Sequence, residues 1–270
     1  MLYRSYVKQK ASNWTPFVFI ALLFSTSALS ANPCAITQNF ENVKVAQVYD
    51  GDTVKLRDGR KVRLIGINTP ERGRDGKKDE PFYLAAKNQL QNIIKKNNNV
   101  KIVLGKSKHD RYKRLLAHLF TIKNENITAT LLRSGMGFMI AIPPNIKFLD
   151  CYKNAEDEAR IQKRGIWNHS YSDAINITSL EQSARGFHRL TGKVDRIGES
   201  RSSVWLNLNS KSGEKFALRI LKKALPYFVE YHPKELLNRQ LTARGWIYEI
   251  NNEQRMTIHH PAALEIGATD

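Results

Sequence analysis

Three short segments of the chain carry side chains that together could hydrolyse a phosphodiester. Residues 50–53 read Asp-Gly-Asp-Thr, residues 63–71 read Arg-Leu-Ile-Gly-Ile-Asn-Thr-Pro-Glu, and residues 110–114 read Asp-Arg-Tyr-Lys-Arg. Oxygen-bearing side chains bind a hard cation, a further carboxylate can accept a proton from water, and two guanidinium groups can hold charged phosphoryl oxygens. The three segments in this order are far more specific than any one of them.

The first segment sets two carboxylates, Asp50 and Asp52, on one tight turn. Their negative charges repel one another unless a cation neutralises them. A set of oxygen ligands indicates Ca²⁺, with Mg²⁺ and Mn²⁺ less favoured. The seven histidines of the chain show no spacing typical of zinc ligands. An ordinary Asp-Gly hairpin turn is the alternative interpretation of this segment.

The second segment contains a charged residue in an apolar strand and a carboxylate after a proline. Arg63 lies among apolar neighbours, where its charge is costly without an anionic partner. A bound phosphate, or a carboxylate in the free protein, would supply that partner. Pro70 fixes the backbone immediately before Glu71, as suits a carboxylate that must meet a reacting water molecule. A solvated loop glutamate is the alternative for Glu71.

The order and spacing of these segments resemble those of the staphylococcal nuclease (thermonuclease) family across roughly residues 43–167. The resemblance implies cleavage at the 5′-oxygen side of a phosphodiester, which leaves 3′-phosphates. It implies metal ligands at Asp50, Asp52, Asn68 and the Thr69 carbonyl; catalytic roles for Arg63, Arg114 and the general base Glu71; and substrate contacts at Tyr112 and Lys113.

The chain departs from the family pattern at three places. Asn68 stands where an aspartate is expected, so one negative charge is lost and weaker or less selective metal binding is predicted. Lys113 stands where the family often has glycine, which predicts a shift in the turn before Arg114. Residues 138–144 lack the tyrosines that stack on the nucleotide in the family prototype. Either Phe138 substitutes for them or the contacts with the base are weak.

The net charge is the unusual feature of the composition. The formal value of +18 attracts polyanions over the range that salt allows. Beside segments that handle phosphate, it indicates DNA, RNA or both as the partner. Basic surfaces also bind membranes or acidic glycans, so the charge by itself leaves those interpretations open.

The first thirty residues are typical of a secretory signal peptide. A basic start without acidic residues leads into an apolar run over residues 17–24 and then into small residues near Ala31. The run is short for a transmembrane helix, and an uncleaved anchor is the alternative. We therefore expect residues 1–30 to be removed and the protein to be periplasmic or secreted, without stable membrane association after cleavage.

Cys34 and Cys151 are the two cysteines of the chain. In an oxidising compartment they predict one disulfide, which would tie the mature N-terminus to a late helix. The chain-entropy model values the closure of such a loop at about 4–5 kcal/mol. Two unpaired thiols are the alternative. Neither cysteine lies in a Cys-x-x-Cys context, which argues against a catalytic thiol.

The periodicity of apolar residues predicts the elements that position these side chains. Five strands between residues 43 and 120 alternate with helices near residues 84–94, 126–133 and 148–164. This succession indicates an OB-like five-stranded β-barrel with three helices. We assign it to a staphylococcal-nuclease-like catalytic domain over residues 31–170.

A second OB-like β-barrel is predicted over residues 185–270, after a polar linker at residues 171–184. Five strand-like segments, with a helix expected over residues 221–231, carry this prediction without a sharp motif. Trp205 would face outward from one of these strands, where it could stack on a nucleic-acid base. The alternative is a tryptophan that covers the end of the barrel.

These observations together predict a metal-dependent nuclease of low sequence specificity, acting on DNA and on RNA as a further substrate. We expect a monomer. The alternative is a non-catalytic nucleic-acid-binding protein on the same fold. Such a binder needs basic residues but neither a general base nor a metal turn, so the joint presence of Asp52, Arg63, Glu71 and Arg114 favours the enzyme.

Overall fold

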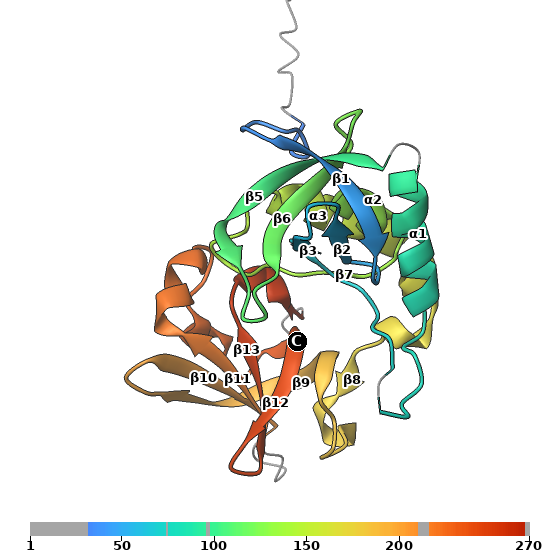
Figure 1. Cartoon of the computed structure of the whole chain (residues 1–270). Coiled ribbons are helices and arrows are strands. Elements are labelled where there is room, and N and C mark those ends of the chain that lie inside the picture. Colours follow the sequence, from blue (N-terminus) through green and yellow to red (C-terminus); the bar gives the residue numbers. More distant parts are fainter. Residues whose placement is uncertain (1–31, 74, 96–97, 210–215, 268–270) are drawn as a thin grey trace, which may run out of the picture. The chain divides into compact units, whose positions relative to one another are not determined.

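The computed structural model describes residues 32–73, 75–95, 98–209 and 216–267, so the signal peptide expected over residues 1–30 lies outside the described residues. Residues 33–270 form one compact unit, and two β-barrels follow one another within it (Figure 1). Among the described residues, no helix is long and apolar enough to span a membrane.

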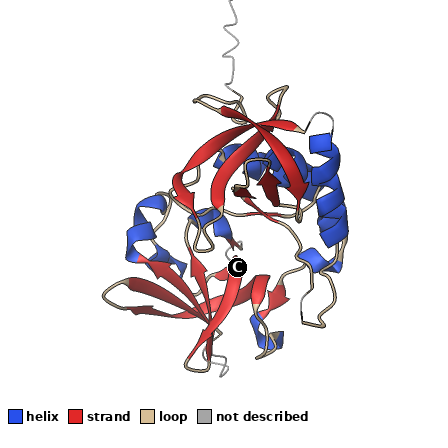
Figure 2. Ribbon diagram, viewed as in Figure 1, coloured by secondary structure: helices blue, strands red, loops and turns tan. Residues whose placement is uncertain are grey.

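Five strands close the first barrel in the order β1-β2-β3-β6-β5. They are β1 (Glu41–Val48), β2 (Thr53–Leu56), β3 (Lys61–Leu64), β5 (Asn99–His109) and β6 (Leu115–Thr121). Figure 2 draws the strands in red and the helices in blue. Only β3 and β6 pair in parallel. In β1 the buried residues are Val43, Val45 and Val48, because a bulge after Val45 shifts the alternation by one residue.

Three helices pack on this barrel, as predicted: α1 (Tyr83–Lys95), α2 (Ile127–Arg133) and α3 (Leu149–Ile161). Asn126 caps α2, since its side-chain oxygen accepts a hydrogen bond from the backbone N of Ala129 at 3.1 Å. A short strand pair, β4 (Ile67–Asn68) with β7 (Phe138–Met139), lies outside the closed barrel. This pair carries Asn68, one of the predicted metal ligands.

The predicted disulfide is present. Cys34 and Cys151 are bonded across 117 residues of sequence. Cys151 belongs to α3 and is buried in the core of the first barrel, and Cys34 packs against the same core. The bond therefore fastens the segment before β1 to the third helix.

The second barrel is closed by β9 (Gly186–Glu199), β10 (Ser203–Leu208), β11 (Phe216–Leu221), β13 (Glu253–Ile258) and β12 (Gln240–Ile250), since β12 pairs with β9. Two short strands, β8 (Ile175–Asn176) and β14 (Leu264–Ile266), extend its sheet. Alternate residues of β10 and β11 fill a separate core of buried residues. The fold predicted for both halves of the chain is thus confirmed.

Two stretches differ in detail from the sequence prediction. The helix expected over residues 221–231 is a 3₁₀ helix, Lys222–Tyr227, and a further 3₁₀ turn follows at Pro233–Leu236. Pro226 lies inside the first of these and lacks the N–H that a longer helix would use. The stretch expected to be a polar linker contains β8 and a 3₁₀ turn at Ile177–Ser179, and Ile177 is buried in the second core.

A cluster of charged side chains joins the two barrels. Arg244 of β12 forms a buried ion pair with Glu156 of α3, with 2.6 Å between Nη1 and Oε2. Glu265 of β14 accepts hydrogen bonds from Arg244, Arg160 of α3 and Arg189 of β9. Because α3 belongs to the first barrel and the other elements to the second, this cluster fixes how β9 and β12 meet the first barrel.

His118 of β6 gives the first core a dependence on pH. Burial lowers the pKa of His118 to about 3, while the side chain of Tyr152 lies 2.7 Å from its Nδ1 atom. In the unfolded chain His118 has an ordinary pKa near 6.5. Between about pH 3 and pH 6.5 it is therefore protonated in the unfolded chain but neutral in the folded protein. Stability attributable to His118 is complete above about pH 6.5 and falls as the pH drops toward 3, by about 1.4 kcal/mol per pH unit.

The test compares the free energy of unfolding of the wild type and of His118→Gln between pH 7 and pH 4. The variant keeps a polar partner for Tyr152 but cannot titrate. Below about pH 6.5, the free energy of unfolding of the wild type is expected to fall steadily relative to that of the variant. Parallel pH profiles would contradict a buried neutral histidine.

Candidate active site

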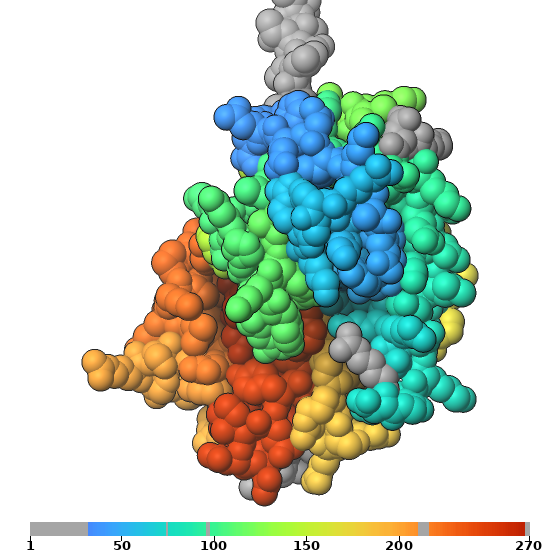
Figure 3. All heavy atoms as spheres, in the orientation of Figure 1, coloured from blue at the N-terminus to red at the C-terminus, as the bar shows by residue number. Residues whose placement is uncertain are grey.

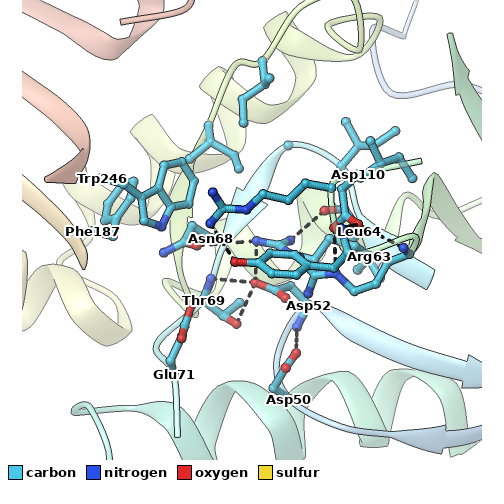
Figure 4. Close-up of a pocket in the computed structure, with 18 of the residues that line it drawn as sticks. Asp50, Asp52, Arg63, Leu64, Asn68, Thr69, Glu71, Asp110, Phe187 and Trp246 are labelled. Atoms are coloured by element: carbon cyan, nitrogen blue, oxygen red, sulfur yellow. Dashed lines mark hydrogen bonds and ion pairs between the residues drawn. The ribbon is translucent and has the colours of Figure 1, made fainter. Parts of the chain in front are cut away.

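A cleft of about 1200 Å³ gathers most of the predicted site residues. Its walls come from the turn after β1, from β3 and β4, from the loop before α1, from the β5–β6 turn, and from strands of the second barrel. Of the predicted residues it brings together Asp50, Asp52, Arg63, Asn68, Thr69, Glu71, Tyr112 and Arg114. Figure 4 labels the first six of these. Lys113, Phe138 and Trp205 are not among the residues that line the cleft.

The acidic turn is held close to α1 and to the loop after β4. Gly51 allows this approach, because a Cβ there would lie 2.7 Å from the Cβ of Ala86 and 2.8 Å from that of Thr69. The Asp50 side chain accepts a hydrogen bond from the backbone N of Asp52 at 3.0 Å. Burial and the neighbouring charge of Asp52 raise the pKa of Asp50 to about 6. Ionisation of Asp50 beside Asp52 is therefore disfavoured in this turn.

The carboxylate of Asp52 is only 6% exposed and makes three hydrogen bonds and one ion pair. Its Oδ2 atom accepts hydrogen bonds from the backbone N and the hydroxyl of Thr69, at 3.0 and 3.1 Å, and lies 2.9 Å from Nη2 of Arg63. Its Oδ1 atom accepts a hydrogen bond from the Thr53 hydroxyl. These contacts fix the carboxylate in one orientation.

Arg63 points its guanidinium into the cleft from a buried position. Its Nη1 donates to the backbone carbonyls of Leu64 and Ile67, both at 2.8 Å, which leaves the Nη2 edge toward Asp52 (Figure 4). Gly66 makes this possible, since it adopts a φ of +90° and a Cβ there would lie 2.2 Å from the Tyr152 ring. The sequence predicted that Arg63 needs an anionic partner, either a bound phosphate or a carboxylate, and here the partner is the carboxylate of Asp52.

The oxygen set at this turn fits a hard cation. Asp50, Asp52 and Asn68 all line the cleft, and a cation bound there would offset the burial and the Asp52 charge that raise the pKa of Asp50. Within the described part of the chain there is no group of three or more His, Cys, Asp or Glu side chains arranged for a metal. A site here thus depends on amide or carbonyl oxygens beside its two carboxylates, and such low ligand charge favours modest affinity.

Glu71 lies on a loop that a second glutamate holds in place. Oε2 of Glu80 accepts hydrogen bonds from the backbone N of Glu71 and from the Tyr171 hydroxyl, both at 2.8 Å. The backbone N of Glu80 also donates to the carbonyl of Glu71 at 3.0 Å. Burial and the charge of Glu80 raise the pKa of Tyr171, so it remains a hydrogen-bond donor at neutral pH. The sequence carried no signal for these two positioning residues.

The Asp110–Arg114 turn directs the second arginine into the cleft. Asp110 accepts hydrogen bonds from the backbone N of Arg114 and, at 2.7 Å, from its Nε. Lys113 adopts the left-handed backbone conformation at φ +63°, which glycine takes at less cost. The hydrogen bond from Lys113 N to the Asp110 carbonyl, at 3.0 Å, closes the turn. Lysine thus occupies the conformation that glycine favours.

Two residues proposed for substrate contact lie elsewhere. Phe138 is only 3% exposed and packs in an aromatic cluster with Trp167, Tyr171 and Phe187, so it has no free face for a base. Trp205 lies outside the cleft, with the guanidinium groups of Arg219 and Arg255 about 5 Å from its ring. Its position does not connect it to the catalytic residues.

The second barrel contributes one wall of the cleft, which the sequence did not predict. The residues concerned belong to β9, β12 and β13 or follow β13 directly, and they are Gly186, Phe187, Trp246, Tyr248, Thr257 and His259. Alternation in β12 does set Arg244, Trp246 and Tyr248 on one face. Only the docking of the two barrels shows that this face meets the first barrel.

The part of the chain that forms most of the first barrel matches known proteins. A family described as "Staphylococcal nuclease homologue" matches residues 61–169. The chain is 31% identical over 130 residues to the thermonuclease of Staphylococcus intermedius, which spans 47% of this chain and 76% of that protein. It is also 31% identical over 136 residues to Endonuclease YncB of Bacillus subtilis, spanning 48% of this chain and 63% of that protein.

A third relative, the thermonuclease of Staphylococcus hyicus, is 29% identical over 134 residues, which are 48% of this chain and 78% of that protein. The family match contains the second and third of the three segments, with Arg63, Glu71 and Arg114, and it ends before the second barrel begins. The fold, a closed five-stranded barrel with three helices, and the residues of the cleft agree with these similarities. The chain therefore belongs to the staphylococcal nuclease family.

Proposed function

We propose that this protein is a metal-dependent nuclease that hydrolyses phosphodiester bonds of DNA, with RNA as a further substrate and with low sequence specificity. The observation that carries the proposal is the cleft itself. It holds Glu71, Arg63 and Arg114 beside the acidic turn, although the turn, the Arg63–Glu71 stretch and Arg114 come from three separate segments. A general base, two guanidinium groups and a cation site are what hydrolysis of a charged phosphodiester requires.

In the proposed reaction, Glu71 accepts the proton of a water molecule whose oxygen attacks phosphorus. The P–O5′ bond breaks, so the 5′-oxygen leaves and a 3′-phosphate remains. Arg63 and Arg114 donate hydrogen bonds to the phosphoryl oxygens, on which negative charge accumulates in the transition state. Their backbone and Asp110 contacts hold both groups in place before substrate binds, which lowers the reorganisation needed for reaction.

We propose Asp50, Asp52, Asn68 and the Thr69 carbonyl as the ligands of a cation, with Ca²⁺ the favoured ion and Mg²⁺ or Mn²⁺ less suited. The ion would supply Lewis-acid polarisation of a phosphoryl oxygen when bound. Asp52 already has its orientation fixed by Thr69 and Thr53, so little side-chain entropy is lost on binding.

Replacing Asn68 by Asp should lower the Ca²⁺ concentration that gives half-maximal activity. The added charge meets the ion at short range, where an interaction of about 1–4 kcal/mol corresponds to about a 5-fold change or more. Activity is titrated with Ca²⁺ for the wild type, Asn68→Asp and the exposed control Asn42→Asp. An unchanged or raised Ca²⁺ requirement in Asn68→Asp alone would mean that residue 68 does not face the ion.

The proposal is tested by incubating plasmid DNA and single-stranded DNA with the protein in Ca²⁺ or in EDTA. The expected result is cleavage in Ca²⁺, none in EDTA, and products that end in 3′-phosphates. Binding of DNA without cleavage in either buffer would support the alternative, a non-catalytic binding protein on the same fold.

We further propose that the protein acts outside the cytoplasm, as a periplasmic or secreted monomer released by cleavage of a signal peptide over residues 1–30. The Cys34–Cys151 bond supports an oxidising compartment. We also retain residues 31–170 as the catalytic domain, 171–184 as its connection to the second barrel, and 185–270 as a domain that binds nucleic acid. Mass spectrometry of the exported protein would give its first residue.

A further inference from the structure

We propose that Trp246, supported by Phe187, forms the base-binding wall of the active-site cleft, and that the second barrel thereby selects unpaired nucleotides. This inference rests on the proposed nuclease function and deepens it, since it names the form of the substrate. The ligand is the flat face of a nucleobase. In a duplex that face is covered by its stacked neighbours, whereas in a single strand or at a frayed end it is accessible.

The first support is the position of Trp246. It lies in the same cleft as Arg63, Arg114 and Glu71, and it is 37% exposed there. Figure 4 shows Trp246 and Phe187 together on the side of the cleft next to Asn68 and away from Asp110. A nucleotide whose phosphate meets the two arginines would therefore have an aromatic surface within the same cavity.

The second support is a continuous line of aromatic contacts from β4 to Trp246. Asn68 pairs with Phe138 across the β4–β7 strand pair, and the ring of Phe138 lies 5.1 Å from that of Phe187. Phe187 is the cross-strand partner of Trp246, and their rings meet edge to face at 5.1 Å. Edge-to-face packing stabilises an aromatic ring from one side. Trp246 is thus held rigidly and still exposes part of its surface.

The third support comes from the aromatic residues that the first barrel places in the cleft. Tyr83 is buried. The ammonium group of Lys61 lies 5.4 Å from the centre of the Tyr49 ring. The guanidinium groups of Arg111 and Arg114 lie 4.7 and 5.4 Å from the centre of the Tyr112 ring. At residues 140 and 142 the wall is isoleucine. Tyr112 is more exposed than Trp246, at 64%, but its ring already contacts two guanidinium groups. Tyr248 of β12 also lines the cleft, with its hydroxyl 3.0 Å from that of Thr257. We therefore assign base stacking to Trp246.

The position of Trp246 is itself fixed by the joint between the barrels. Arg244 lies two residues earlier on the same face of β12, and its ion pair with Glu156 anchors that face against α3. Removing the second barrel would take away the ion-pair partner of Glu156 and uncover the face of α3 on which Arg244 packs. For this reason the experiment uses the full chain and single substitutions.

The test measures binding of a short single-stranded oligothymidylate, and of an abasic strand with the same number of phosphates, in EDTA so that no hydrolysis is needed. The wild type should bind the oligothymidylate about 5- to 150-fold more tightly than the abasic strand, which is the range expected for stacking of one base. Trp246→Ala should lose most of that preference while it keeps the affinity for the abasic strand. Trp246→Phe should retain most of it, because it keeps a ring.

Phe40→Ala is the matched control, since Phe40 is 45% exposed and does not line the cleft. It should leave the ratio of the two affinities unchanged, and thermal unfolding checks that each variant is folded. If Trp246→Ala lowered the affinity for both strands equally, Trp246 would act on the structure or on the phosphate backbone, and the proposal would be overturned. An unchanged affinity for the oligothymidylate would overturn it as well. Because binding is measured without turnover, a protein that never cleaves DNA can still pass or fail this test.

Discussion

Replacing Glu71 by Gln is expected to lower kcat by about 10²–10⁴-fold, the usual contribution of a positioned general base. Glutamine has nearly the shape of glutamate but cannot accept the proton of the attacking water. The backbone contacts of residue 71 with Glu80 do not involve its side chain, so the loop should keep its conformation. The loss should therefore appear in kcat, while affinity for DNA in EDTA stays close to that of the wild type.

Single-turnover cleavage of a labelled oligonucleotide in saturating Ca²⁺ gives the chemical step directly. Glu230→Gln serves as the control, because Glu230 is an exposed carboxylate of the second barrel that does not line the cleft. A near-normal rate in Glu71→Gln would remove Glu71 from its assigned role. A loss of DNA affinity as large as the loss of rate would indicate instead that the loop had moved.

The second large effect is expected at the joint between the barrels. Arg244→Met should lower the free energy of unfolding by about 3–5 kcal/mol, the usual cost of leaving one member of a buried ion pair without its partner. Glu156 is only 1% exposed, so water cannot replace the lost guanidinium. Glu156 would keep a single hydrogen bond, from the backbone N of Met139 at 2.7 Å, which is insufficient for a buried carboxylate.

Denaturant titrations of the oxidised protein measure this change. Lys153→Met is the matched control, because Lys153 forms an exposed ion pair with Asp157 on the same helix as Glu156; its removal should cost less than about 1 kcal/mol. Adding Glu156→Gln to Arg244→Met should restore much of the loss, since no buried charge then remains. If the single variant were as stable as the control, the joint would not be a buried ion pair in solution.

The Arg244 prediction and the role proposed for Trp246 meet in β12, which carries both residues on one face. A variant that loosens the joint should also disturb the wall that we propose for the base. The residues proposed for catalysis belong to the first barrel, so the second barrel contributes to the cleft by contact and not by supplying the proposed chemistry. Arg244→Met is therefore expected to affect binding of single strands more than the rate of the chemical step.

The sequence determined the first barrel closely. The two cysteines predicted one bond because the chain has no third. Local signals sufficed for other features: alternation in β1, the Asn126 cap of α2 and the Asp-Gly turn at Asp50. The requirement of buried Arg63 for an anion could also be foreseen, because desolvation of a charge is costly wherever the strand lies. Such features depend on near neighbours in the chain, and they are the part of a structure that sequence patterns report.

Tertiary structure decided the rest, because it depends on which surfaces meet. Phe138 looked available for substrate, but the second barrel covers it with Phe187. Trp205 and Trp246 look alike as outward-facing residues of alternating strands, yet only Trp246 reaches the cleft. The carboxylate that holds the Glu71 loop, Glu80, is separated from it by a loop whose course no local pattern specifies. Period-two alternation tells which residues share a face of a strand, whereas the partner of that face is set by the packing of distant segments.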